Sequence, residues 1–153
     1  MPSSLVSLVI MTGSGRDSEV ERMVALARQA ITLDTVDRAL AVEAIGCIVL
    51  VTDSAFLAES LRGKAVHIEL GEPGEEFHLG RRLRELITEQ GMEKVFYMGG
   101  GSGALLSSED MGHIAEILLS ADKLIIANNF YSTDFAAFAP AQAIESIELP
   151  AVD

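Results

Sequence analysis

Short and almost continuous apolar runs alternate with segments of helical periodicity along this 153-residue chain. An apolar run of about four to eight residues that ends at a turn signal is typical of a strand covered on both faces. Apolar residues at helical spacing predict helices at residues 17–31, 34–46, 55–61, 79–91 and 107–121. Strands are expected at residues 5–12, 47–53, 65–70, 94–98, 123–128 and 134–139. This alternation predicts an α/β fold, a three-layer sandwich with a mainly parallel sheet, in a single domain over residues 1–153.

Residue types at the expected helix ends agree with this pattern. The first helix is expected to begin at Asp17 or Ser18, which are favourable N-cap residues, and to bury one apolar side. That side consists of Val20, Met23, Val24, Ala27 and Ile31. Asp34 is expected to cap a separate second helix. Ser107, with Asp110 three residues later, predicts a capping box for the last helix.

Acidic residues outnumber basic ones by 23 to 11, which gives a formal net charge of −12. This charge argues against nucleic acid as a partner, because nucleic acid binding needs clustered lysine and arginine. A small anionic ligand stays compatible, because a local arginine, a metal ion or a helix N-terminus can reverse the field within one cleft. Cys47 is the single cysteine, no apolar stretch is long enough to span a membrane, and the first residues fit a strand better than a signal peptide. We therefore expect a cytoplasmic protein with neither nucleic acid nor membrane as a partner.

Four loops follow expected strands at the edge of the sheet where ligands bind in such folds, at residues 13–16, 52–54, 99–103 and 128–132. The first of them can bring backbone N–H groups and the guanidinium of Arg16 to a phosphate at the start of a helix. It matches neither GxxxxGK[ST] nor GxGxxG, and an ordinary strand-to-helix turn explains its residues equally well.

Three arginines, Arg81, Arg82 and Arg84, are concentrated in the first turns of the helix at 79–91. Basic side chains are electrostatically unfavourable near a helix N-terminus unless an anion or an acidic neighbour is present. These arginines therefore either bind an anionic substrate or pair with Glu85 and the acids of the preceding loop.

Two aspartates, Asp53 and Asp134, lie at strand ends on the expected ligand side of the sheet. A carboxylate in such a place either holds Mg²⁺ or caps a turn. His67, His78 and His113 lie in separate elements without metal-ligand spacing, which argues against a zinc site. No Ser-His-Asp arrangement is detectable from the spacing.

The order of these motifs resembles the nucleotidyltransferases of the GT-A-like fold, and especially the small guanylyltransferases that make 2-phospholactate-guanosine diphosphate or the molybdenum cofactor dinucleotide. That family begins with a strand and a glycine-rich loop ending in arginine, and LVIMTGSGR at 8–16 is similar to it. IVLVTD at 48–53 and HLGRRLRELI at 78–87 resemble the motifs that follow. IIANNFYSTDFAAFAP at 125–140 is similar to the segment that lies along the nucleotide and acceptor cleft.

The resemblance implies that Gly13, Ser14, Gly15 and Arg16 bind a nucleoside triphosphate. In the family, a mid-chain DxPLL motif supplies an aspartate that holds the divalent metal, and Ser102 stands at that position in FYMGGGSGALLSSEDM. A serine hydroxyl without a carboxylate partner is a poor ligand for Mg²⁺. The family's lysine downstream of the arginine is also absent, with only Arg28 nearby, and family members continue for several elements beyond the length of this chain.

The expected function is transfer of a nucleotidyl group from a nucleoside triphosphate to a small anionic acceptor, with Mg²⁺ as cofactor if the protein is an active enzyme. The alternative is a nucleotide-binding or phosphometabolite-binding regulatory protein that has lost the metal site. A third hypothesis is a flavodoxin-like or Rossmann-type domain, which predicts no strand-loop-strand unit near residues 123–139. A homodimer is a further expectation. The expected catalytic residues are Arg16, Asp53 and Asp134; the expected nucleotide-binding residues are Gly13, Ser14, Gly15, Arg16, Gly100, Gly101 and Ser102; and the expected acceptor-binding residues are Arg81, Arg82, Asn128, Asn129 and Ser132.

Overall fold

One mixed sheet forms the centre of the molecule in the computed structural model, which describes residues 5–14, 18–72, 77–131 and 134–148. Its strands are β1 (Val6–Thr12), β2 (Ile45–Thr52), β3 (His67–Leu70), β4 (Val95–Gly99), β5 (Leu124–Ala127) and β6 (Phe135–Ala139). The helices are α1 (Glu19–Leu40), α2 (Ala55–Ser60), α3 (Leu79–Gln90), α4 (Ser108–Leu119) and the 3₁₀-helix η1 (Ala141–Ser146).

The strand order β3-β2-β1-β4-β6-β5 combines a parallel part with an antiparallel end. Strands β1 to β4 are parallel, with Val9 of β1 opposite Val49 on one side and Tyr97 on the other. β6 runs antiparallel to both β4 and β5. The mainly parallel sheet is thus confirmed, and the pair β5–β6 is the late strand-loop-strand unit that a flavodoxin-like or Rossmann-type fold does not predict.

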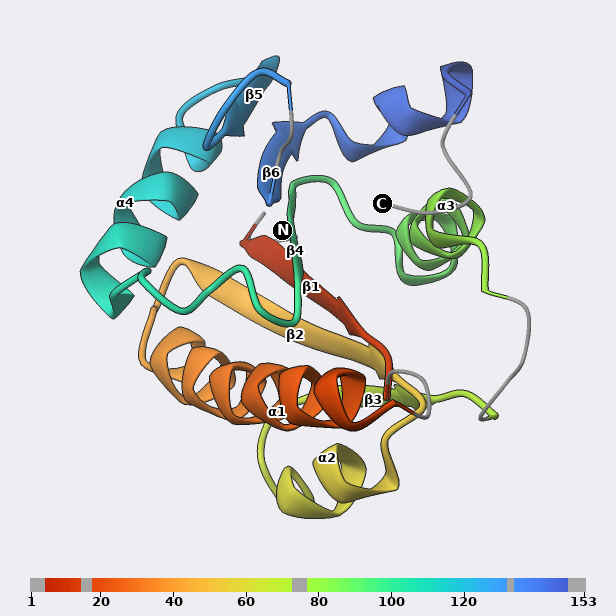
Figure 1. The fold of residues 1–153 in the computed structure, drawn as a ribbon. Helices are drawn as coiled ribbons and strands as arrows, with labels where there is room; N and C mark the ends of the chain where they lie inside the picture. Colours follow the sequence, from red (N-terminus) through yellow and green to blue (C-terminus); the bar gives the residue numbers. More distant parts are fainter. Residues whose placement is uncertain (1–4, 15–17, 73–76, 132–133, 149–153) are drawn as a thin grey trace.

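Helices cover both faces of the sheet and give the predicted three layers (Figure 1). Alternate side chains of β1 point to opposite faces, as a strand buried on both sides requires. Leu8 and Ile10 belong to the core under α1, α2 and α4, whereas Val9 and Met11 belong to the core under α3 and η1. No helix within the described ranges is long and apolar enough to cross a membrane.

The helix α1 is continuous from Glu19 to Leu40, so the prediction of two helices was wrong. Residues 31–34 contain neither glycine nor proline, and Asp34 lies inside the helix instead of capping a new one. Gly46, expected to end a helix, lies in β2. A continuous backbone here carries the buried side chains of the C-terminal half of α1 directly onto the sheet.

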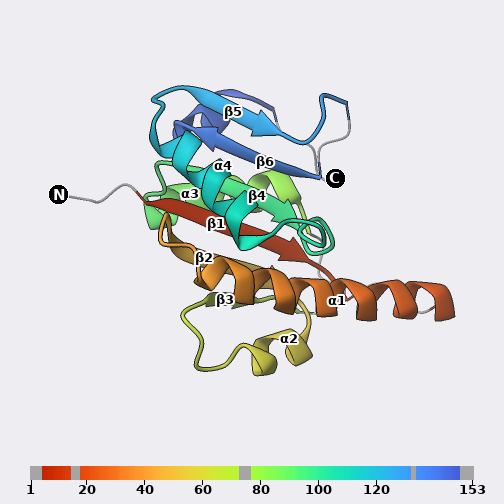
Figure 2. The same cartoon turned by 90° about the vertical axis from the view of Figure 1, so that its left-hand side faces the viewer.

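The predicted apolar side of the first helix was also wrong for its N-terminal half. Val20 and Met23 are 66% and 68% exposed, and Val24 is exposed as well. Figure 2 shows the reason, because the first turns of α1 project beyond the ends of the strands. The buried side of α1 consists of Ala25, Thr32, Thr35, Val36 and Ala39.

Apart from Asp34, the predicted helix caps that lie in the described residues are confirmed. Ser18 caps α1, and its hydroxyl accepts a hydrogen bond from the N–H of Glu21. Ser107 and Asp110 form the predicted capping box of α4. Gly91 ends α3 in the left-handed conformation, with φ of 60°, which favours glycine. Asp17, the other candidate cap of α1, lies outside the described residues.

Candidate functional site: a cleft at the carboxyl edge of the sheet

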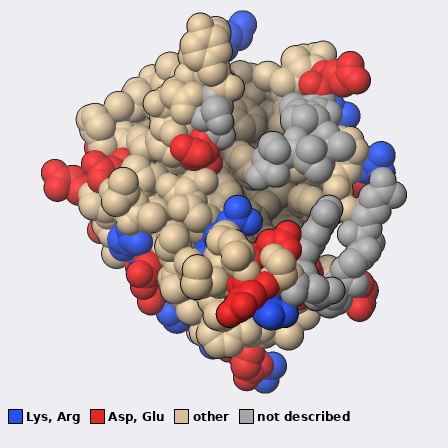
Figure 3. All heavy atoms as spheres, in the orientation of Figure 1, with Lys and Arg blue, Asp and Glu red and all other residues tan. Residues whose placement is uncertain are grey.

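Five strand ends meet at one edge of the sheet and surround a cleft of about 1340 Å³. The loops after β1, β2, β3, β4 and β5 contribute to its lining, together with the start of β6 and the N-terminal turns of α3. Figure 3 shows this face hollowed near its centre, with charged side chains around the rim. All four loops predicted at the ligand edge reach the cleft, whereas Gly15, Arg16 and Ser132 lie outside the described residues.

Asp53 fastens the first loop to the end of β2. One carboxylate oxygen accepts a hydrogen bond from the Ser14 N–H at 2.6 Å, and the other accepts from the Ser14 hydroxyl at 2.8 Å. Both residues are half-buried. Asp53, predicted to be catalytic, therefore has a structural role that its position after β2 explains, because β1 and β2 are neighbours in register.

Two glycines of the loop after β4 are required by packing. A Cβ atom built on Gly100 would lie 2.3 Å from Thr12 Oγ1, and one on Gly103 would lie 2.4 Å from Thr35 Oγ1. The N–H of Gly100 donates to the carbonyl of Met11, and its own carbonyl accepts from the Thr32 hydroxyl. Gly100 was predicted to bind nucleotide, yet both of its backbone polar groups are already engaged within the protein.

Gly13 and Gly101 line the same cleft and have no such packing requirement. A Cβ on Gly13 would meet nothing within 4 Å, and one on Gly101 would lie at an ordinary 3.5 Å from Arg28 Cγ. Neither glycine has a positive φ in the described structure. Their missing side chains leave bare backbone facing the cleft, which suits close approach of a ligand.

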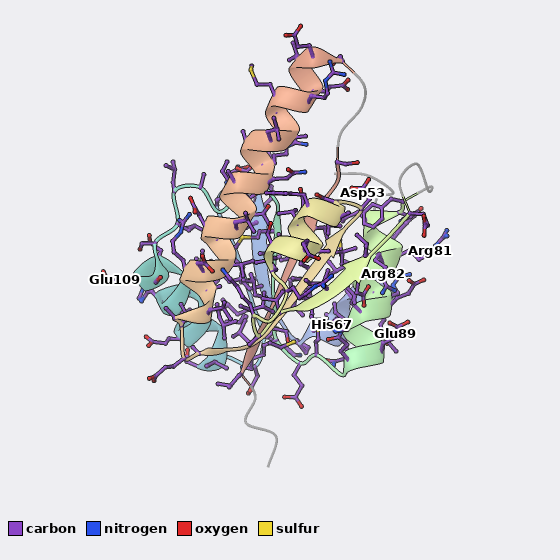
Figure 4. All side chains as sticks on the ribbon, turned by 90° about the horizontal axis from the view of Figure 1, so that it is seen from below. Asp53, His67, Arg81, Arg82, Glu89 and Glu109 are labelled. Carbon is purple, nitrogen blue, oxygen red and sulfur yellow. The ribbon has the colours of Figure 1, made fainter. Side chains whose placement is uncertain are left out.

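Arg82 is largely neutralised by acidic neighbours. Its guanidinium pairs with Glu69 of β3 and Glu85 of its own helix, and Glu89 lies 3.8 Å away. Burial alone would lower the pKa of Arg82, but the hydrogen bonds and negative charges of these acids raise it. Figure 4 shows Arg82 with His67 and Glu89 beside β3 and α3, and Arg81 closer to the outer surface. Of the two alternatives for this arginine, pairing with acids is therefore the one realised.

The other two arginines of α3 have different surroundings. Arg84 turns away from the cleft, where it donates to the carbonyls of Ile144 and Ile147 and fastens η1 to α3. Arg81 is exposed and lines the cleft, and within the described residues its side chain has no hydrogen-bond or ion-pair partner. His78 caps α3 by accepting a hydrogen bond from the Arg81 N–H at 3.1 Å, which explains this histidine without a ligand.

Arg28 of α1 also lines the cleft, although the sequence did not predict it as a site residue. Its guanidinium forms no hydrogen bond or ion pair with any residue that the structure describes. The spacing of Arg28, Thr32 and Thr35 places all three on one side of a continuous helix. That signal was hidden by the prediction of a helix break between residues 31 and 34.

The loop between β5 and β6 is closed by a reciprocal pair. Asn128 Nδ2 donates to Asp134 Oδ2 at 2.7 Å, and the Asp134 N–H donates to Asn128 Oδ1 at 3.0 Å. Both residues line the cleft. Asn129, predicted to bind the acceptor, accepts a hydrogen bond from the Tyr131 N–H through its side-chain oxygen and is absent from the cleft lining.

Among the described residues, the carboxylates of this cleft do not form a cluster that could bind a metal ion. No group of three or more His, Cys, Asp or Glu side chains that could hold a metal occurs within the described ranges. Asp53 and Asp134 are each engaged by a neighbouring residue, and Glu69 is engaged by Arg82. The carboxylates of the described residues therefore do not form a binding site for a divalent cation.

Comparison with family models gives no match, and comparison with curated proteins gives none either. Solved structures are similar. A cytidylyltransferase from Leptospira borgpetersenii serovar Hardjo-bovis has a TM-score of 0.68 and 15% identity over 95% of this chain and 66% of its own length. A CMP:2-keto-3-deoxy-manno-octonic acid synthetase complexed with CTP has a TM-score of 0.62 and 11% identity, covering 93% of this chain and 76% of the synthetase.

A Mycobacterium tuberculosis H37Rv protein solved in complex with manganese has a TM-score of 0.59 and 9% identity over 94% of this chain and 76% of that protein. The chain spans 66% of the length of the Leptospira enzyme. At sequence identities this low, the structural similarity establishes the fold alone. The chain has an α/β fold with a six-stranded, mainly parallel sheet flanked by helices, and this is the fold of the similar nucleotidyltransferase structures.

Proposed function

We propose that this protein binds a nucleoside triphosphate in the cleft at the carboxyl edge of the sheet and transfers the nucleotidyl group to a small anionic acceptor. The observation that carries the proposal is the pair Gly13 and Gly101, which present bare backbone to the cleft without a packing reason. The fold shared with the cytidylyltransferase and with the CTP-bound synthetase supports the same reaction class.

The cleft offers distinct surroundings for the parts of such a substrate. Apolar and aromatic side chains, including Phe77, Leu79 and Tyr97, suit a nucleobase, whereas the backbone at Gly13 and Ser14 suits its phosphates. Gly15 and Arg16 continue that loop and keep their predicted role as phosphate ligands. Arg81 and Asn128 lie among the lining residues and are the proposed contacts for the acceptor.

The reaction is an in-line displacement at the α-phosphorus. An acceptor oxygen forms the new P–O bond as the bond to the β-phosphate oxygen breaks, and pyrophosphate leaves. The residues of this chain would contribute by holding the two reactants in line and by neutralising phosphate charge. No step is assigned to a metal ion, because the described carboxylates do not form a site that fits one.

A second candidate function is nucleotide binding without transfer. It is favoured by the engagement of both predicted catalytic aspartates, Asp53 with Ser14 and Asp134 with Asn128. A carboxylate held in this way is less available to a metal-bound substrate. Ser102 at the position of the family's aspartate agrees with the same reading.

Two finer proposals concern the base of the nucleotide and the chemical class of the acceptor. The resemblance of the sequence motifs favours a guanosine nucleotide, whereas the Leptospira protein is a cytidylyltransferase and the synthetase was solved with CTP. We propose a phosphorylated or carboxylated small molecule as the acceptor, because Arg81, the proposed acceptor contact, lines the cleft and its positive charge has no partner in the described chain.

Isothermal titration with CTP, GTP, ATP and UTP, each with and without Mg²⁺, tests the proposal. Binding of one nucleotide, together with pyrophosphate release when phosphorylated acceptors are added, is the result expected for the transferase. Binding that is indifferent to Mg²⁺ and never releases pyrophosphate assigns the second function. Absence of binding by all four nucleotides rejects both.

A further inference from the structure

Arg28 stands out among the cations of α1 because its guanidinium forms no hydrogen bond or ion pair with the described residues. Arg38, on the same helix, donates to the carbonyls of Gly103 and Leu106 and so holds the glycine loop. Arg22 has an interaction elsewhere. Arg28 is exposed at the cleft and has no partner in the described chain, although the protein carries 23 acidic residues.

The backbone of the glycine loop lies directly against this arginine. A Cβ on Gly101 would stand 3.5 Å from Arg28 Cγ, so the side chain of Arg28 leaves α1 alongside the loop. In the described part of the chain, the N–H of Gly101 donates no hydrogen bond, and the hydroxyl of Ser102 has no partner. One guanidinium, one amide and one hydroxyl that have no partner in the described chain thus belong to residues that line the cleft.

Thr32 joins the helix turn that carries Arg28 to the glycine loop. Its hydroxyl lies 2.8 Å from the carbonyl of Arg28 and 3.0 Å from the carbonyl of Gly100. Gly100 in turn donates to the end of β1. The three available donors are therefore attached to parts of the fold that hold one another in place, which lowers the ordering cost of binding a ligand.

We propose that Arg28, the N–H of Gly101 and the hydroxyl of Ser102 bind a phosphate group of the substrate, at a subsite separate from the first loop. This inference rests on the proposed function for the source of the phosphate, which is either the nucleotide or a phosphorylated acceptor. A phosphate suits the site because it offers several acceptor oxygens in a tetrahedral arrangement, and arginine can engage two of them.

Binding of tripolyphosphate, CTP and glycerol 3-phosphate to the wild-type protein and to Arg28→Ala tests the inference. We expect tripolyphosphate to bind Arg28→Ala roughly 10- to 100-fold more weakly, the range for loss of hydrogen bonds to a charged group. Arg28→Lys should recover part of the affinity, because it keeps the charge and loses the planar fork. Arg62→Ala, which removes another exposed arginine that pairs with Glu59 outside the cleft, is the matched control and should bind all three probes like the wild type.

The probes separate the two sources of phosphate. Weaker binding of CTP by Arg28→Ala assigns the subsite to the nucleotide, and weaker binding of glycerol 3-phosphate alone assigns it to the acceptor. The inference is overturned if Arg28→Ala binds every probe as the wild type does, or if the wild type binds none of them. Tripolyphosphate binding that depends on Arg28 in a protein that binds no nucleotide would reject the proposed function and keep the subsite.

Thermal unfolding distinguishes the loss of a phosphate contact in Arg28→Ala from a loss of protein stability. The side chain of Arg28 has no partner in the described structure, so Arg28→Ala should unfold at the wild-type temperature. Ser102→Ala, which removes only one neutral donor, should lose less affinity for tripolyphosphate than Arg28→Ala. A drop in the unfolding temperature of Arg28→Ala that accounts for its weaker binding would overturn the inference.

Discussion

At the scale of single residues, the glycines of the cleft divide into two groups with opposite expected behaviour. Gly100→Ala and Gly103→Ala place a methyl group against the side chains of Thr12 and Thr35, and we expect each to lower the free energy of unfolding by about 1–3 kcal/mol. Gly13→Ala and Gly101→Ala meet no such obstacle and should leave stability unchanged or raise it by up to about 1 kcal/mol. Urea unfolding of the four variants measures the difference.

The same four variants should divide in the opposite way when ligand binding is measured. Gly13→Ala and Gly101→Ala should bind CTP or tripolyphosphate more weakly while their folds stay intact, because a methyl group would occupy space that the ligand needs. If both bind like the wild type, bare backbone at these two positions has no ligand role, and the main support for the proposed function is lost.

Residue identity alone predicted where the cleft lies but not which of its side chains are available to a ligand. Asp53, Ser14 and Asp134 all reach the predicted edge of the sheet, yet each is hydrogen-bonded to a residue far along the chain or across a loop. Arg82 lies beside the predicted ligand edge but is paired with Glu69 of β3. Partners of this kind come from tertiary contacts between distant segments, and a local pattern carries no information about them.

At the scale of single elements, Lys94 joins the start of β4 to the end of α4. Its ammonium donates to the carbonyls of Leu118, Leu119 and Ala121 at the C-terminal end of the helix, where carbonyl groups lack the full set of intrahelical partners. Lys94→Met should lower the free energy of unfolding by about 1–3 kcal/mol. Lys123→Met, at an exposed position nearby in the chain, is the control and should change stability little in the same urea titration. Equal stabilities of the two variants would contradict this role.

The capping box of α4 predicts a pH dependence on the acid side. Hydrogen bonds from the Ser107 hydroxyl and then from its N–H lower the pKa of Asp110 below the ordinary 3.8. A lowered folded-state pKa contributes stability that is present above the unfolded-state pKa and is lost as pH falls through the folded-state value. Below about pH 5, the stability of the wild type should therefore fall more steeply than that of Asp110→Asn.

Thermal unfolding at a series of pH values measures the two acid slopes. Glu109→Gln changes an acid of the same helix turn that does not accept the capping hydrogen bonds, and it should keep the wild-type slope. Parallel slopes for the wild type and Asp110→Asn would show that the cap contributes nothing to the acid dependence.

Element types followed well from local patterns, whereas one boundary and one face did not. The capping box at Ser107, the N-cap at Ser18 and the strands were predictable because each depends on neighbouring residues. The continuity of α1 was not, because Asp34 is a favourable cap and is also tolerated inside a helix. Exposure of Val20 and Met23 depends on how far α1 extends past the sheet, which is a property of the assembled fold.

At the scale of the whole molecule, the alternation of strands and helices predicted three layers and a mainly parallel sheet but not the strand order. Continuous apolar runs require cover on both faces, and only helices on both sides supply it. The placement of β6 between β4 and β5 has no local signal, since any of these short apolar strands could pair with another. The cleft depends on that order, because it brings Asn128 and Asp134 to the edge where β1, β2 and β4 end.

The two hydrophobic cores lie on opposite faces of one sheet, so we expect the chain to unfold as a single unit. Leu86 of α3 and Leu118 of α4 are fully buried on opposite faces, and each core includes side chains of β1. Leu86→Ala and Leu118→Ala should each cost about 2–5 kcal/mol. Because neither core can lose β1 without exposing the other, both substitutions should move the same transition. Far-ultraviolet circular dichroism and the near-ultraviolet signal of Tyr97, which packs against one core, record it. Two transitions, with only one of them shifted by Leu86→Ala, would contradict a single domain.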